Sequence, residues 1–286
     1  MTCISEALAN ASALISGAEA RLLMRHVLGR SHAWLLAHDD EAMTTDEMTR
    51  YAELLAHRSE GMPVAYLLGS REFYGRTFAV TREVLIPRPE SELLVDLGIA
   101  KLRGRVAPAI LDLGAGSGCL AVTLALEIPT GKVIAADLLP AAVALARHNA
   151  ERLGAALKVI ESDWFSAVSP GDFDLIVANP PYIAAHDPHL GQGDLRFEPP
   201  LALSSGPDGL AAIRTIIRQA PGYLAPGGWL FIEHGYDQAV ALVALLQQAG
   251  FSDIEQHPDL AGILRVSGGR MGVKKSAALD VGAQCP

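Results

Sequence analysis

Four consecutive residues, Asn179-Pro180-Pro181-Tyr182, directly follow the apolar segment 173–178 and have the chemistry to bind a planar amino group. The two prolines fix φ and lack backbone N–H groups, so the loop offers acceptors without competing donors. The side-chain oxygen of Asn179 and the carbonyl of Pro180 could each accept one N–H, with Tyr182 against the planar face. The motif predicts an acceptor loop, Asn179–Tyr182, for an NH₂ group.

Such an acceptor loop suits transfer of a methyl group to a poor nucleophile. The lone pair of an amide nitrogen is delocalised into its carbonyl, so it must be steered toward the electrophile. Two fixed acceptors can hold the nitrogen in line with a sulfonium methyl and stabilise the positive charge that develops. No general base is needed, because the methylated nitrogen can lose its proton after transfer. The simpler alternative is a rigid Pro-Pro turn without chemistry.

A second motif, Gly114-Ala115-Gly116-Ser117-Gly118, separates a predicted strand from a predicted helix and is here called the glycine loop. Open α/β sheets bind ligands at this edge, and glycines let the backbone approach them. The spacing typical of NAD folds would need a glycine at Cys119. Asp137, nineteen residues past Gly118, could accept hydrogen bonds from both ribose hydroxyls. These residues predict a nucleoside site; the alternative is a plain turn, with Asp137 capping a helix that begins at Pro140.

The elements that must position these loops alternate between helix and strand from about Glu90, which predicts an α/β fold. The apolar segments 109–111 and 175–178 are typical of central strands covered on both faces. We therefore expect a doubly wound, mostly parallel, seven-stranded sheet of the Rossmann-like kind. The expected helices span 90–103, 117–127, 140–153, 207–220 and 237–249, and the expected strands span 109–113, 132–136, 157–160, 173–178, 228–233, 252–257 and 263–267.

The chain as a whole divides into four predicted parts. They are an N-terminal helical domain at 1–70, a β-hairpin linker at 71–89, the α/β domain at 90–267 and a disordered tail at 268–286. In the sequence of the small helical domain we find no set of residues suited to catalysis. We expect it to recognise a protein substrate, or else to act as a stabilising lid.

Composition excludes several classes of protein. Half of the 286 residues are hydrophobic and 19% are charged, which excludes a disordered chain. No apolar run approaches the roughly 18 residues of a membrane span, and no basic residue precedes Arg21, so we expect a cytoplasmic protein without a membrane partner. The net charge is −9, and residues 89–267 hold 20 acidic and 11 basic residues. Direct binding of nucleic acid is therefore not expected.

The motifs together resemble one family, the peptide chain release factor glutamine methyltransferases of the class I S-adenosylmethionine-dependent group. The acceptor loop alone also resembles DNA adenine methyltransferases. The helical N-terminal domain, the connector Ile86-Pro87-Arg88-Pro89-Glu90-Ser91-Glu92 and the segment Phe197-Glu198-Pro199-Pro200-Leu201-Ala202-Leu203 distinguish this family from them. The family more often has threonine where Ser91 stands, and the hydroxyl is kept.

The resemblance implies a reaction and a set of roles. Gly114 to Gly118, Asp137 and Asn179 would bind S-adenosylmethionine, which leaves as S-adenosylhomocysteine. Trp164 would pack on the adenine. Residues Asn179 to Tyr182 would receive the glutamine of the Gly-Gly-Gln motif in class I release factors, which is methylated at N5. The alternatives are methylation of DNA adenine at N6 or of a ribosomal-protein glutamine, and ordinary core burial of Trp164.

Two further residues are predicted to be structural. His234 lies at a strand end without a cysteine, histidine or acid at ligand spacing, so no metal site is expected there. Glu198 could act as a base, but we expect it to fix its loop by accepting hydrogen bonds from backbone N–H groups.

Overall fold

The computed structural model describes residues 2–272 of the chain, and its first part is a helical bundle, as the sequence pattern predicted. Ser16 and Thr44 each cap a helix and exchange hydrogen bonds with a glutamate three residues on. Leu23, Met24 and Tyr51 fill the centre of the bundle. Its helices are α1 (Ile4–Ala11), α2 (Gly17–Leu28), α3 (His32–Ala37), α4 (Thr45–Ser59) and α5 (Val64–Leu68).

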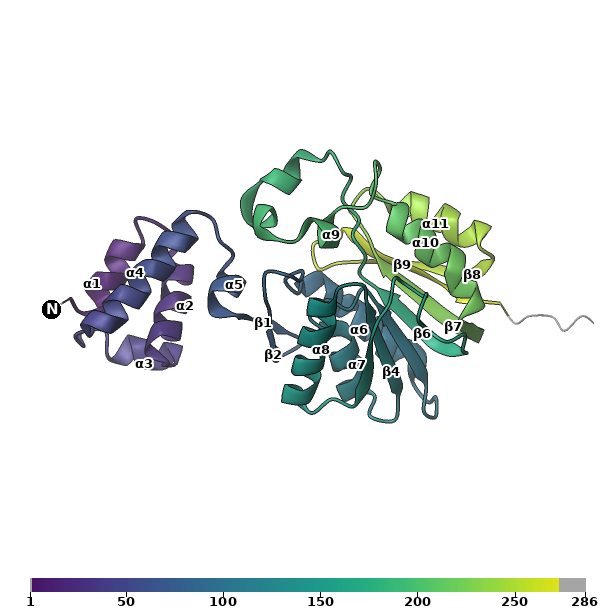
Figure 1. Cartoon of the computed structure of the whole chain (residues 1–286), viewed down its shortest axis with the longest axis horizontal. Helices are drawn as coiled ribbons and strands as arrows, with labels where there is room; N and C mark the ends of the chain where they lie inside the picture. Colours follow the sequence, from purple (N-terminus) through teal and green to yellow (C-terminus); the bar gives the residue numbers. More distant parts are fainter. Residues whose placement is uncertain (1, 273–286) are drawn as a thin grey trace, which may run out of the picture.

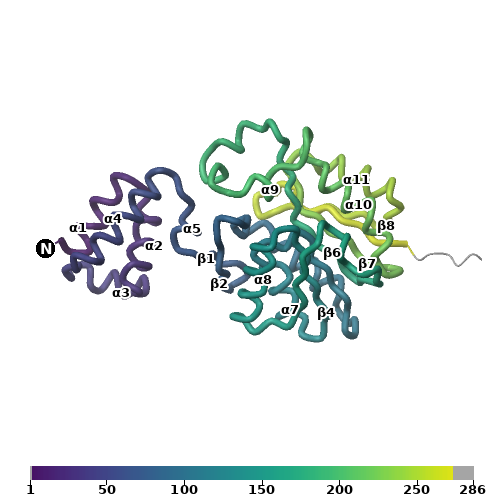
Figure 2. The backbone as a smooth tube through the Cα atoms, viewed as in Figure 1, coloured from purple at the N-terminus to yellow at the C-terminus, as the bar shows by residue number. Residues whose placement is uncertain are grey.

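An antiparallel hairpin of β1 (Ser70–Phe73) and β2 (Arg76–Ala79) links the bundle to the rest of the chain (Figure 2). The fully buried side chain of Asn149 holds this hairpin. Its oxygen accepts a hydrogen bond from the N–H of Ala79 at 2.8 Å, and its nitrogen donates to the carbonyls of Ala79 at 3.0 Å and Ser117 at 2.9 Å. One side chain thus ties the hairpin to the glycine loop.

The remainder forms one sheet of seven strands in the order β5-β4-β3-β6-β7-β9-β8. Strands β3 to β7 pair in parallel, and β9 runs antiparallel to both β7 and β8. This confirms the predicted mostly parallel seven-stranded fold. The strands are β3 (Ala109–Leu113), β4 (Lys132–Asp137), β5 (Leu157–Glu161), β6 (Phe173–Ala178), β7 (Leu224–Glu233), β8 (Phe251–Pro258) and β9 (Leu264–Met271).

Helices cover both faces of the sheet (Figure 1). Successive side chains of a strand point to opposite faces. Ile110 and Leu175 therefore pack in one core, while Leu111 and Ile176 pack in the other, and all four are fully buried. The first core includes α6 (Glu92–Leu102), α7 (Cys119–Glu127) and α8 (Pro140–Leu153), and the second includes α10 (Ala211–Gln219) and α11 (Ala239–Gln248).

Strand β9 corrects one predicted boundary. The sequence predicts a tail from residue 268, because Ser267-Gly268-Gly269 begins a stretch with little periodicity, but β9 continues to Met271. Phe231 of the neighbouring strand β7 fills the space over Gly268, where a Cβ would lie 2.2 Å from its Cδ1. Glycine is needed here for close packing within the sheet. Residues 273–286 of the predicted tail lie outside the described residues.

A long connecting segment, residues 183–206, runs from β6 to α10 and contacts the helical bundle. The guanidinium of Arg58 on α4 lies 3.0 Å from the carboxylate of Asp194, and Arg196 donates to the carbonyl of Glu60. The segment contains the short helices η2 (Pro188–Gly191), η3 (Gly193–Phe197) and α9 (Pro200–Leu203). Within residues 2–272 no helix has the length and apolar character needed to cross a membrane.

Candidate active site

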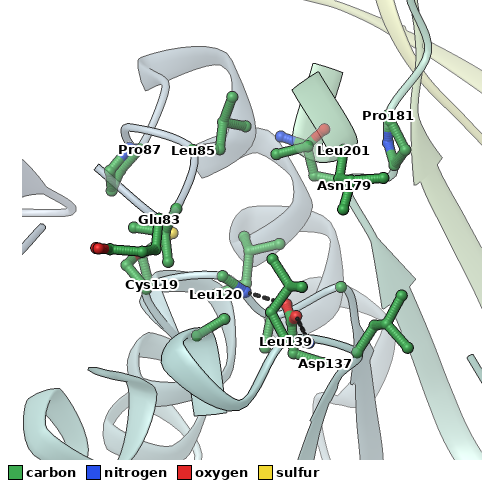
Figure 3. Close-up of a pocket in the computed structure, with 18 of the residues that line it drawn as sticks. Glu83, Leu85, Pro87, Cys119, Leu120, Asp137, Leu139, Asn179, Pro181 and Leu201 are labelled. Carbon is green, nitrogen blue, oxygen red and sulfur yellow. Dashed lines mark hydrogen bonds between the residues drawn. The ribbon is translucent and has the colours of Figure 1, made fainter. Parts of the chain in front are cut away.

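A pocket opens at the carboxyl ends of β3, β4 and β6, where the sequence places both loops. In Figure 3, Asp137 and Leu139 lie on one side of it, and Asn179, Pro181 and Leu201 lie on the other. Eight of the predicted site residues line this pocket: Gly114, Ala115, Gly116, Ser117, Asp137, Trp164, Asn179 and Pro181.

A second pocket adjoins the first around the acceptor loop. It is lined by the other two residues of that loop, Pro180 and Tyr182. The residues that line both pockets are Leu85, Arg88, Asn179 and Ala202. Asn179 therefore stands between two cavities, an arrangement that suits a reaction between two bound molecules.

Backbone hydrogen bonds shape the glycine loop. The N–H groups of Gly114 and Ala115 donate to the carbonyl of Ala136 at 2.9 and 3.1 Å, and the N–H of Gly116 donates to the carboxylate of Asp137 at 2.8 Å. Gly114 and Gly116 have φ values of 73° and 54°. Only glycine adopts this region without strain, so the glycines allow the sharp turn from β3 toward α7.

Gly118 lines neither pocket and has a different role from the glycines before it. It precedes α7 with a φ of 80°, and a Cβ at this position would lie 3.0 Å from the Cβ of Ala146 on α8. Gly118 therefore allows α7 and α8 to approach each other, and its predicted contact with a ligand remains a prediction.

Asp137 ends β4 and uses both carboxylate oxygens. Oδ2 accepts from the N–H of Gly116 at 2.8 Å, and Oδ1 accepts from the N–H of Leu139 at 2.9 Å. The second bond is made to the residue before α8, and α8 has no side-chain N-cap hydrogen bond, so the helix-capping alternative is wrong. A carboxylate has about four lone-pair positions, which leaves capacity for ribose hydroxyls. Burial raises the pKa of Asp137 above its usual value.

Trp164 has an unusual backbone for a large residue, with a φ of 49°. The hydroxyl of Ser162 donates to the carbonyl of Trp164 at 2.8 Å and accepts from the N–H of Ala167 at 3.0 Å, which holds this turn. The indole is partly buried and lines the first pocket. Strained backbone of this kind clusters at ligand sites, and the contact of Trp164 with adenine stays a prediction.

The Asn179 side chain has one satisfied and one unsatisfied end. Its nitrogen donates to the hydroxyl of Ser91 at 2.9 Å. Its oxygen is buried and has no hydrogen-bond partner among residues 2–272. An unpaired buried acceptor is costly unless a ligand completes it. Asn179 therefore presents a free acceptor where the sequence predicts one.

Glu233 is a site residue that the sequence analysis did not identify. It ends β7, is 1% exposed, and accepts from the hydroxyls of Ser91 at 2.5 Å and Tyr182 at 3.3 Å. Burial raises the pKa of Glu233 to about 7 and raises the pKa of Tyr182. An acid at the carboxyl end of a strand beside the acceptor loop, directly after the apolar residues 230–232, is a signal that could have indicated it.

Glu198 and His234 have the structural roles that the sequence predicts. Glu198 is buried and accepts from the N–H of Ile86 at 3.1 Å and from Arg88. His234 bonds the carbonyl of Gly235 and the hydroxyl of Ser267, both at 2.8 Å. Within the described part of the chain, no cluster of three or more His, Cys, Asp or Glu side chains is suited to a metal ion.

Sheet order, glycine loop and acceptor loop together define a class I methyltransferase. The family model for the methyltransferase small domain matches residues 91–192, and the model for the PrmC N-terminal domain matches residues 2–69. Release factor glutamine methyltransferase of Bordetella pertussis is 54% identical over 252 residues, covering 88% of this chain and 93% of that protein. The enzyme of the same name in Burkholderia pseudomallei is 50% identical, covering 88% and 91%. The chain belongs to the release factor glutamine methyltransferase family.

Solved structures agree with the fold. The catalytic domain of human Mettl16 has a TM-score of 0.55 at 16% identity, covering 76% of this chain and 81% of that one. The Thermus thermophilus 16S rRNA N2 G1207 methyltransferase, solved with AdoMet and guanosine, has a TM-score of 0.53 at 21% identity, covering 71% and 49%. At such low identities, these structures support the class I fold alone.

Proposed function

We propose that this protein transfers a methyl group from S-adenosylmethionine to N5 of the glutamine in the Gly-Gly-Gln motif of class I release factors. The observation that carries the proposal is the buried, unpartnered oxygen of Asn179 at the junction of two pockets. A primary amide entering from the second pocket would donate a hydrogen bond to that oxygen. The family relationship supports release factors as its source.

The first pocket fits S-adenosylmethionine. The glycine loop brings backbone atoms to its wall, the Asp137 carboxylate has lone pairs left for ribose hydroxyls, and the Trp164 indole offers a face for adenine. When bound, S-adenosylmethionine supplies an electrophilic methyl group. The backbone of the glycine loop would hold it in the pocket, which the exposed side chains of Leu138 and Leu201 also line.

The acceptor loop orients the substrate amide. The Asn179 oxygen and the Pro180 carbonyl would each accept one N–H of the glutamine NH₂, which sets the direction of the nitrogen lone pair. Acceptors already fixed before the reaction stabilise positive charge on nitrogen without reorganisation. After transfer the nitrogen can release its proton to water, so no general base is assigned.

We also assign recognition of the release factor to the helical bundle. The bundle carries no chemical cluster of its own, and its helix α4 contacts the connecting segment that follows the acceptor loop. Direct nucleic-acid binding is not part of the proposal, because residues 89–267 hold 20 acidic and only 11 basic residues. Release factors act on ribosomes, so the cytoplasm is where this reaction would occur.

The test is incubation with methyl-labelled S-adenosylmethionine and either a class I release factor, adenine-containing DNA or a ribosomal-protein fraction. Mass spectrometry then locates the label. We expect N5-methylglutamine in the Gly-Gly-Gln motif and no label when that glutamine is replaced by alanine in the release factor. Label at adenine N6, or in a ribosomal protein with none in the release factor, would overturn the assignment.

A further inference from the structure

A chain of buried hydrogen bonds runs behind the acceptor loop. Asn179 Nδ2 donates to Ser91 Oγ at 2.9 Å, and Ser91 Oγ donates to Glu233 Oε2 at 2.5 Å. The hydroxyl of Tyr182 donates to Glu233 Oε1 at 3.3 Å. Ser91 is 2% exposed and Glu233 is 1% exposed, so bulk solvent does not reach these groups.

The protons in this chain can be arranged in one way while Glu233 is ionised. A carboxylate only accepts hydrogen bonds, and a serine hydroxyl has one proton. Ser91 must therefore give its proton to Glu233, and it can only accept from Asn179. The Asn179 amide consequently turns its NH₂ group toward Ser91, and its oxygen is the end left without a partner among the described residues.

We propose that Glu233 is a positioning residue, which acts through Ser91 to fix the Asn179 amide with its oxygen toward the substrate. This inference rests on the proposed function. When Glu233 is protonated, it can donate to Ser91, and Ser91 can then donate to the oxygen of Asn179. The amide turns over and presents NH₂ to the substrate NH₂, so two donors face each other and the acceptor is lost.

The groups around Glu233 place its protonation near neutral pH. Burial is the largest influence and raises the pKa of Glu233 to about 7, and the nearby Glu90 raises it further, whereas Ser91, Tyr182 and Arg265 lower it. The ionised form is the one that orients Asn179, so turnover should rise as the pH increases through this pKa. The titratable or charged groups around Glu233 are Glu90 before α6, Cys119 on α7, Tyr182 after β6, Arg265 on β9 and the adjacent His234.

The first test is Glu233→Gln, measured as kcat and KM over a range of pH. A glutamine can accept from or donate to Ser91, so it no longer fixes one arrangement. We expect kcat to fall about tenfold or more, the cost of one well-placed transition-state hydrogen bond, while KM for S-adenosylmethionine changes less than about twofold. In the wild type we expect kcat to fall as the pH drops below the pKa of Glu233, and we call this fall the acid limb. It should disappear in Glu233→Gln. Asp112, whose pKa burial also raises to about 7, is unchanged in this variant, so the loss assigns the limb to Glu233.

A second pair of variants covers the case in which Glu233→Gln fails to fold. Ser91→Ala removes the hydroxyl and should lower kcat as Glu233→Gln does. Ser91→Thr keeps the hydroxyl, so most of the wild-type kcat and the acid limb should remain. The matched charge control is Glu90→Gln, which removes a neighbouring carboxylate outside the hydrogen-bond chain. It should shift the acid limb to lower pH and leave the plateau of kcat unchanged.

The possible outcomes separate the two proposals. If the wild type methylates the release factor but Glu233→Gln keeps the wild-type kcat and acid limb, the positioning role is wrong and the proposed function stands. Equal losses of kcat in Ser91→Thr and Ser91→Ala would also overturn the positioning role. If the wild type leaves the release factor unmethylated, the proposed function fails, and the positioning role fails with it.

Discussion

The glycine loop and the acceptor loop lie at neighbouring strand ends, yet different interactions hold them in place. In the glycine loop the bonds are made by the backbone, and its carboxylate partner, Asp137, is 21 residues from Gly116. In the acceptor loop the bonds are made by buried side chains. Asn179 reaches Ser91, 88 residues away, and Tyr182 reaches Glu233, 51 residues away. One loop is thus encoded locally, whereas the other depends on the assembled sheet.

This difference separates binding from turnover. Changes in the glycine loop should alter the affinity for S-adenosylmethionine, because its backbone lines the first pocket. Changes in the network behind the acceptor loop should alter turnover, because that network orients one side chain between the two pockets.

Asn179→Ala should reduce kcat for release-factor methylation by about 10²–10³-fold, the usual cost of removing one preorganised polar group that stabilises transition-state charge. The alanine leaves the glycine loop and Asp137 unchanged. Calorimetric affinity for S-adenosylmethionine should therefore fall much less than kcat. A parallel collapse of both quantities would contradict the separation of binding from turnover.

Asp137→Ala should lower the affinity for S-adenosylmethionine more than it lowers kcat. The ribose would lose a charged acceptor worth about 1.5–3 kcal/mol, equivalent to roughly 10- to 100-fold in Kd. The N–H of Gly116 also loses its partner, so the loop becomes less well fixed. Saturating S-adenosylmethionine should restore most of kcat. The control is Asp137→Asn, which keeps one oxygen acceptor and should lose less affinity; equal losses would show that charge alone matters.

Two glycine substitutions distinguish ligand contact from packing. Both Gly116→Ala and Gly118→Ala strain a positive φ, at about 1–2 kcal/mol each. A Cβ at Gly116 meets nothing within 4 Å, whereas a Cβ at Gly118 lies 3.0 Å from Ala146. We expect Gly118→Ala to lower the melting temperature more, and Gly116→Ala to lower the affinity for S-adenosylmethionine more. Thermal unfolding and calorimetry on both variants check this, and the reverse order would assign Gly118 to the ligand.

The sequence predicted the features that lie within short stretches of the chain, including the acceptor loop itself, but it did not predict the buried side chains that hold that loop. The seven strands follow from apolar runs such as 175–178, and the glycine loop and Asp137 follow from short-range spacing. Glu233 was missed because its importance comes from Ser91 and Tyr182, which only the folded sheet brings to it. The boundary at residue 268 was wrong for a similar reason, since Phe231 on another strand determines why glycine stands there.

Asp194→Ala should have the smallest effect, because the connecting segment contacts the bundle through partly exposed groups. The Asp194 side chain is 50% exposed, and Arg58 keeps a second partner in Glu19 at 2.8 Å. Such an ion pair contributes less than about 1 kcal/mol, so the melting temperature should fall by no more than about 2–4 °C. Affinity for S-adenosylmethionine should be unchanged, while KM for the release factor should rise if the bundle and segment together hold it. The control is Asp194→Asn, which keeps the shape and loses the charge. A large loss of cofactor affinity in either variant would mean that this contact supports the first pocket, and that the two loops share a support remote from both.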